Sequence, residues 1–133
     1  MVLISAVSLL AVLGSAAAAA IPEQGDQAPT VRRIAATAAL AAQEYDIGVE
    51  GGRVIAAAEV EEATLFLTEA RRTAGLLPAV AAKPAIAELD QLLAMVARVA
   101  PPESVTVRAR LLAETLASRF NVSLEEVVER AAD

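Results

Sequence analysis

Apolar residues recur at steps of three and four along four segments of this chain. In an α-helix, which turns once every 3.6 residues, such a series lies on one face. The pattern therefore predicts helices over residues 31–45, 57–73, 84–99 and 102–120. The connections between them are short and contain Gly, Pro and polar residues, which is typical of an antiparallel four-helix bundle. We accordingly expect an all-α fold.

The stripes that should form the core are rich in alanine. Their members are Val31, Ile34, Ala38, Ala41 and Tyr45; Val60, Ala63, Leu67, Ala70 and Ala74; Ile86, Leu89, Leu93, Val96 and Ala100; and Val105, Ala109, Leu112, Leu116 and Phe120. Because alanine buries little apolar surface, stability should depend mainly on the Leu, Ile, Val and Phe residues. Leu40 falls off its stripe and predicts a second contact face, while Phe66 and Leu92 should widen the second and third stripes.

Several residues mark the ends of these helices. Thr30 can cap the first helix, Gly75 is suited to end the second, and Pro84 fits the first turn of the third. Ser123 and Glu126 form a capping box, Ser-x-x-Glu, which predicts a short extra C-terminal helix. The apolar residues of that helix would be Leu124, Val127, Val128 and Ala131.

The connection over residues 46–53 should interrupt the first two helices. Gly48, or the pair Gly51–Gly52, can adopt positive φ there at little cost. Strand signals are nearly absent from the chain, and only residues 53–55 have extended character. Tyr45 should pack beneath this turn and donate its hydroxyl to a backbone carbonyl, because a buried phenol needs a hydrogen-bond partner.

Residues 1–20 carry no charge and have the layout of an export leader. An apolar run over residues 2–13 is followed by Gly, Ser and a tract of alanines, which is typical of a signal-peptide helix with cleavage after Ala18, Ala19 or Ala20. The run lacks the usual Lys or Arg at its start, and a buried apolar N-terminal helix is the alternative. A cleaved leader would make the protein periplasmic or secreted, whereas an uncleaved one would be its only attachment to a membrane.

After the leader, the chain should consist of a linker over residues 21–29 and a bundle domain over residues 30–133. The composition limits the kinds of functional site that this part can form. The chain has 133 residues, a formal net charge of −6, no Cys and no His. These absences exclude disulfides, thiolate or imidazole metal sites and Ser-His-Asp catalysis. An acidic chain also lacks the basic face that nucleic acid requires. We therefore expect neither an enzyme nor a nucleic-acid-binding protein.

Carboxylates are the metal-capable groups that remain. Glu59 and Glu62 are three residues apart on the second predicted helix, and Glu69 lies one heptad beyond Glu62. At about 100° per residue, all three fall within an arc of about 80° that borders the apolar stripe. Carboxylates in such a position can converge on a hard cation, and Asp46 and Glu50 in the preceding turn can reach the same region. The alternative is that these residues are solvated surface acids that complement the helix dipole.

The central segment is similar to a known protein family. From residue 44 it reads Glu-Tyr-Asp-Ile-Gly-Val-Glu-Gly-Gly-Arg-Val-Ile, and it continues with Glu59-Val60-Glu61-Glu62 and Phe66. This order resembles the extracytoplasmic helical region that precedes the membrane part of bacterial high-affinity iron permeases, the oxidase-dependent iron transporters. The resemblance extends over residues 33–122 and is most specific between Tyr45 and Phe66.

Two departures limit what this resemblance implies. Val60 stands where the family usually has Tyr, and the Arg-Glu-x-x-Glu helices of the membrane permease are not found in this sequence. Transport itself is therefore not implied. The resemblance implies an exported helical accessory domain that binds iron or docks on a membrane iron-uptake permease, with Glu59 and Glu62 as the iron-ligand candidates. The alternative is a secreted helical protein-interaction module with no metal.

Overall fold

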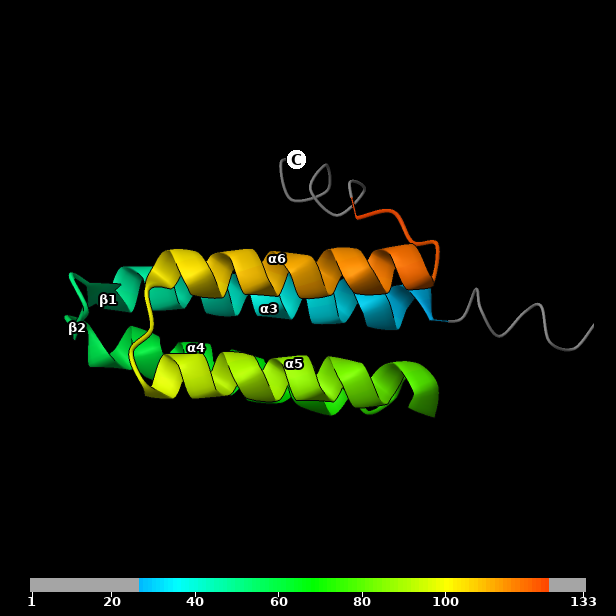
Figure 1. Cartoon of the computed structure of the whole chain (residues 1–133), viewed down its shortest axis with the longest axis horizontal. Coiled ribbons are helices and arrows are strands. Elements are labelled where there is room, and N and C mark those ends of the chain that lie inside the picture. Colours follow the sequence, from blue (N-terminus) through cyan, green and yellow to red (C-terminus); the bar gives the residue numbers. More distant parts are fainter. Residues whose placement is uncertain (1–26, 125–133) are drawn as a thin grey trace, which may run out of the picture.

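Figure 1 shows the computed structural model of the chain, in which residues 27–124 are described. The elements of this part are, in order, α3 (Ala28–Gly48), β1 (Val49–Glu50), β2 (Arg53–Val54), α4 (Ala57–Ala74), α5 (Ala79–Ala97) and α6 (Pro102–Arg119). Successive helices run in opposite directions and pack against each other, and α6 returns to lie beside α3 (Figure 1). The predicted antiparallel four-helix bundle is confirmed.

Helices α4 and α6 have the bounds that their sequence patterns predict to within one residue. Gly75 follows α4 as its C-cap, and its backbone N–H donates to the carbonyls of Arg71 and Arg72. Pro101 and Pro102 precede and open α6, where a missing backbone N–H costs nothing because the first turn of a helix has no acceptor for it.

Helix α3 begins earlier than predicted. It starts at Ala28, so Thr30 lies within its first turn and does not cap it. Gln27 occupies the cap position without a side-chain hydrogen bond, and Pro29 stands in the first turn. Proline is favoured there because its fixed φ matches the helix, which explains why the helix starts inside the predicted linker.

Helix α5 also begins earlier, at Ala79, and the prediction that Pro84 opens it is wrong. Pro78 occupies the cap position, and its carbonyl accepts the first backbone hydrogen bonds of the helix. Pro84 consequently lies inside α5, where it cannot donate to the carbonyl of Val80. Both residues are exposed, so water can solvate that carbonyl and reduce the cost of the proline.

The connection between α3 and α4 is a β hairpin that the sequence predicts only in part. Strand β2 falls in the expected extended segment, whereas β1 was not anticipated. The two strands pair antiparallel, residues 49–50 with residues 53–54. Gly51 and Gly52 have φ values of +59° and +76°, so this pair, and not Gly48, takes the positive φ. Two successive residues with positive φ form the tight turn that suits the twist of a hairpin.

The core lies where the predicted stripes meet. Its largest fully buried side chains are Tyr45, Ile34, Leu67, Leu89, Leu92, Val31 and Val105. Ile86 and Leu93 are only partly buried at the margin of α5, and Phe66 is partly buried as predicted. The second contact face predicted at Leu40 is wrong, because that side chain is 45% exposed. Helix α3 contacts its neighbours through Val31, Ile34 and Tyr45 and through small buried alanines.

Tyr45 joins the end of α3 to the connection between α5 and α6. Its buried hydroxyl donates to the carbonyl of Ala100, which confirms the predicted bond to the backbone and identifies a partner 55 residues away. Burial raises the pKa of this phenol. The tyrosine therefore stays protonated and fixes the end of the bundle at which the hairpin lies.

Some predictions fall outside the described residues. The signal peptide, residues 21–26 of the linker and the C-terminal helix beyond Leu124 belong to this group. Within residues 27–124, no helix combines the length and the apolar character needed to cross a membrane.

Candidate functional site

The site begins with a close approach of α3 and α4 at the hairpin end of the bundle. The carbonyl of Gly48 accepts hydrogen bonds from the backbone N–H groups of Ile55 (2.8 Å) and Ala56 (3.2 Å). A Cβ atom at position 48 would lie 2.7 Å from Cγ2 of Val60 and 2.9 Å from the carbonyl oxygen of Ala56. Only glycine fits at this contact, and the two helix backbones are therefore held close together.

This approach brings together three acidic side chains, Glu44, Glu59 and Glu62, which we call the glutamate cluster. Glu44 lies one turn before Gly48 on α3, Glu59 lies in the first turn of α4, and Glu62 lies one turn further along. Glu44 and Glu59 are half-buried, whereas Glu62 is exposed. The cluster thus spans two helices and opens to solvent on one side.

The members of the glutamate cluster interact through their charges. The pKa of the Glu44 carboxyl is raised above its ordinary value of 4.5, first by burial and then by the negative charges of Glu62 and Glu59. A hydrogen bond between the side chains of Glu44 and Glu62 raises it further. Burial and neighbouring negative charge both favour the protonated form of Glu44. A cation placed among these carboxyls would relieve the same repulsion.

Of the sequence-predicted candidates, Glu59 and Glu62 lie together as expected. Glu69 does not join them, because it forms an ion pair with Arg72 on its own helix. Asp46 and Glu50 are exposed, and neither contributes to the shift in the pKa of Glu44. The predicted arc of acids along α4 is therefore shorter than expected, and the hairpin residues do not extend it.

Glu44 is the member that sequence reasoning missed. Its neighbours on α3 form the core stripe, and it stands directly before Tyr45 at the margin of that stripe. The available signal was Gly48, one helical turn later. A glycine at the end of an alanine-rich helix indicates a close helix contact, and the acid one turn before it then faces the partner helix.

The chemistry of the cluster suits a hard cation, but its geometry is incomplete. Carboxylate oxygens are the donors that such cations prefer. Within the described range, residues 27–124, no three acidic side chains stand close enough together to hold a metal ion. A side-chain hydrogen bond links Glu44 and Glu62, whereas Glu59 acts on Glu44 through its charge.

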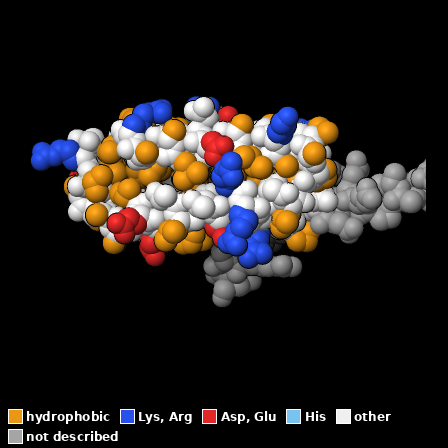
Figure 2. All heavy atoms as spheres, turned by 90° about the horizontal axis from the view of Figure 1, so that it is seen from below, with side chains coloured by type: hydrophobic (Ala, Val, Ile, Leu, Met, Phe, Trp, Pro, Cys, Tyr) orange, Lys and Arg blue, Asp and Glu red, His pale blue; other side chains and the backbone are white. Residues whose placement is uncertain are grey.

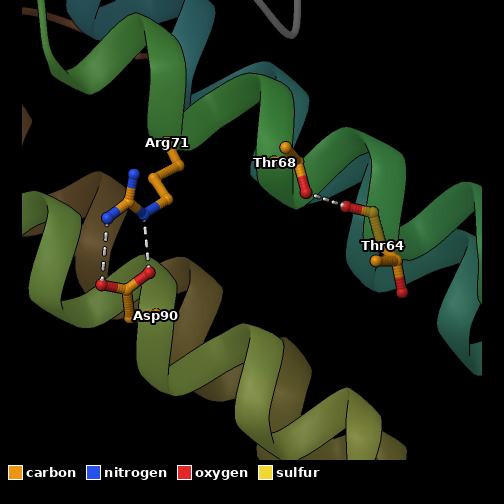
Figure 3. A network of polar contacts seen from close by, with 4 residues as sticks. All are labelled: Thr64, Thr68, Arg71 and Asp90. Carbon is orange, nitrogen blue, oxygen red and sulfur yellow. Dashed lines mark hydrogen bonds and ion pairs between the residues drawn. The ribbon is translucent and has the colours of Figure 1, made fainter.

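Two acids of α5 are paired with arginines of neighbouring helices. Nε of Arg71 on α4 lies 2.6 Å from a carboxylate oxygen of Asp90 on α5 (Figure 3), and Arg108 on α6 lies 3.1 Å from Glu88 on α5. Figure 3 also shows that the hydroxyl of Thr68, one turn from Arg71, points back along α4 toward Thr64 and away from this pair. The two ion pairs join α4 to α5 and α5 to α6, and each brings an acid together with a base.

Comparison with known proteins identifies a family. The family model described as the iron permease-associated 4-helix bundle domain matches residues 22–131. No curated protein and no solved structure matches the chain.

Proposed function

This chain belongs to the family of iron permease-associated 4-helix bundle domains, and from that premise we propose that it is an exported, non-catalytic domain that binds iron for an iron-uptake permease. Iron is the cargo in this proposal, and the glutamate cluster is where it binds. Glu59 and Glu62 are the ligands that the sequence indicates, and Glu44 is added by its position in the fold.

The observation that carries this proposal is the placement of Glu44, Glu59 and Glu62 beside one another, where burial and the two neighbouring charges raise the pKa of Glu44. Like charges held together are unfavourable, and this favours the protonated form of Glu44. A cation bound among the same carboxyls would remove the repulsion. Glu59 adds a third negative charge beside the pair, which strengthens the attraction for a cation.

The incomplete ligand set is compatible with transfer of the ion rather than storage. Affinity for a hard cation rises with the number of charged ligands and with the rigidity of the site. Two carboxylates in contact and a third nearby leave several coordination positions to water or to a partner. Iron held in this way could be passed on, which suits a domain associated with a permease.

Export is a part of the proposal that can be tested separately. The apolar, uncharged residues 1–20 support it as a signal peptide. Mass spectrometry of the protein recovered from outside the cytoplasm should give a mass that begins near residue 21. A mass that includes residues 1–18 would show that the leader is retained as an anchor.

Calorimetry with iron tests the binding directly. We expect saturable binding of ferrous iron under anaerobic conditions, or of ferric citrate, with a stoichiometry near one. The triple variant Glu44→Gln/Glu59→Gln/Glu62→Gln should bind at least about tenfold more weakly, because it removes every charged donor of the cluster.

A charge-matched control separates the cluster from the overall acidity of the chain. The variant Glu61→Gln/Glu103→Gln/Glu114→Gln removes the same charge from exposed positions elsewhere on α4 and α6. It should bind iron like the unmodified chain. Equal losses in both triple variants, or no saturable binding by the unmodified chain, would refute the proposed iron site.

A metal-free docking domain is the second candidate, and one observation favours it. Figure 2 shows hydrophobic side chains over much of the side formed by α4 and α5, with a few charged side chains among them. Leu65, Leu76 and Val80 are 68%, 72% and 74% exposed. Apolar side chains on such a face are typical of a protein contact. This candidate predicts that Leu65→Ser/Val80→Ser weakens association with a permease and that the triple Gln variant does not.

A further inference from the structure

A groove between α3 and α6 has a volume of about 540 Å³. Alanines such as Ala36 and Ala39 on α3 and Ala113 on α6 line it, together with Arg32 and Arg110. Small side chains on both helices leave room for a further element between them. The groove is therefore apolar at its base, and its charged lining residues are the two arginines and Asp46.

The chain itself enters this groove after α6. Asn121 has a φ of +53°, and the N–H of Val122 donates to the carbonyl of Ala117. This bond across the helix end is the Schellman motif, which reverses the direction of the chain. Nε of Arg32 on α3 donates to the carbonyl of Ser123 (3.3 Å), and Leu124 then lines the groove.

The sequence that follows Leu124 has the properties that the groove requires. Leu124, Val127, Val128 and Ala131 recur at the helical spacing, so they would share one apolar face. Residues 125–133 contain four acids and a single arginine. Acids close to the start of a helix complement its dipole, and the capping box of Ser123 and Glu126 favours a helix that starts here.

We propose that residues 125–133 pack as a fifth helix along the α3–α6 groove, antiparallel to α6, with their apolar face on its alanines. This inference goes beyond the proposed iron binding and does not depend on it. The occupant is the protein's own C-terminal segment.

The length and charge of residues 125–133, and the range that the family model matches, all support this segment as the occupant of the groove. Nine helical residues would extend about 13 Å, about half the length of the 18-residue helix α6, so residues 125–133 can lie alongside it. The acids of the segment complement Arg32 and Arg110 at the margins of the groove. The family model also continues to residue 131, beyond the four helices, which makes the segment part of the domain.

Disulfide trapping tests the position of the segment, because the chain contains no cysteine. In the full chain, the pair Ala36→Cys/Val128→Cys should form an intramolecular disulfide under mild oxidation. The control pair Thr64→Cys/Val128→Cys places one thiol on exposed α4 and should remain reduced. Equal trapping of both pairs, or a disulfide that links two chains, would overturn the proposal.

Thermal unfolding tests the contact independently of thiol chemistry. Val128→Asn changes the apolar face of the segment, and Glu129→Asn puts the same residue on its polar face. We expect the first to lower the melting temperature by about 4 °C or more and the second to leave it unchanged within about 1 °C. A chain that ends at Leu124 should melt at least as low as Val128→Asn. Equal melting temperatures of all these forms would show that the groove does not hold the segment.

Discussion

The two sides of α4 differ in how the acidic residues around them are neutralised. On the side that faces α5, Arg71 of α4 pairs with Asp90 of α5, and Glu88 of α5 pairs in turn with Arg108 of α6. On the side that faces α3, Glu59 and Glu62 lie near Glu44. Both of the neighbouring charges that raise the pKa of Glu44 belong to these carboxylates. The same helix therefore has a balanced side and an unbalanced side.

This difference separates what holds the bundle together from what it presents to a ligand. Exposed ion pairs such as Arg71–Asp90 add little stability, but they satisfy their charges. The glutamate cluster opposes folding slightly, and the fold maintains it through the tight contact at Gly48 and the anchor at Tyr45. A feature that costs stability and is held in place by specific contacts is expected at a functional site.

The largest expected effect comes from removing the close contact that assembles the cluster. Gly48→Ala places a Cβ atom 2.7 Å from Val60 and 2.9 Å from the carbonyl of Ala56. Because a backbone atom cannot move aside cheaply, we expect a loss of about 2 kcal/mol in the free energy of unfolding, measured by urea denaturation. Gly75→Ala is the control, since its Cβ would lie 3.2 Å from the nearest atom and should cost less than half as much.

The next effect concerns the anchor at the same end of the bundle. Tyr45→Phe leaves the buried carbonyl of Ala100 without its hydrogen-bond donor. An unsatisfied buried acceptor costs about 1–2 kcal/mol, and the midpoint of urea unfolding should fall accordingly. An unchanged midpoint would mean that water replaces the hydroxyl and that the tyrosine does not fix this end.

A smaller, pH-dependent effect is expected for Glu44→Gln. Since the native pKa of Glu44 is raised, the native state binds the proton more tightly than the unfolded state does. The contribution of this group to stability is therefore fully present below pH 4.5 and is lost as the pH rises through the native pKa. The variant should be the more stable form at neutral pH, and the advantage should shrink on acidification. Unfolding curves at several pH values that show a constant difference would contradict this coupling.

The smallest effect is expected on the balanced side of α4. Asp90→Asn breaks the ion pair with Arg71, whose partners are 51% and 46% exposed. Water screens such a pair, so the loss should not exceed about 0.5 kcal/mol and should vanish in high salt. A loss as large as that of Tyr45→Phe would show that the Arg71–Asp90 pair holds α4 and α5 together.

The helical fold could be predicted because it depends on local periodicity. The stripe from Val31 to Tyr45 is buried as expected, since the spacing of apolar residues decides which face a helix buries. The start of α5 could not be placed, because Pro84 is compatible both with a first turn and with a solvated helix interior. Similarly, Thr30 has a capping side chain, but Pro29 allowed the helix to begin before it.

The candidate site could be predicted only in part, for a different reason. Glu59 and Glu62 are close in sequence, so helical geometry alone places them together. Glu44 belongs to another helix, and its approach to Glu62 depends on how closely the backbones meet at Gly48. Contacts of this kind are decided by packing between helices, which sequence periodicity does not specify.

The account rests on the claim that Glu44, Glu59 and Glu62 form one coupled group that takes up a cation. The most direct measurement is a titration of the glutamate side-chain carboxyl carbons by NMR, with and without gallium(III) citrate as a diamagnetic substitute for ferric iron. We predict that Glu44 titrates above its ordinary value of 4.5 without metal, and that gallium shifts the signals of the cluster selectively. A Glu44 midpoint at or below 4.5, or equal gallium shifts at all glutamates, would contradict the account.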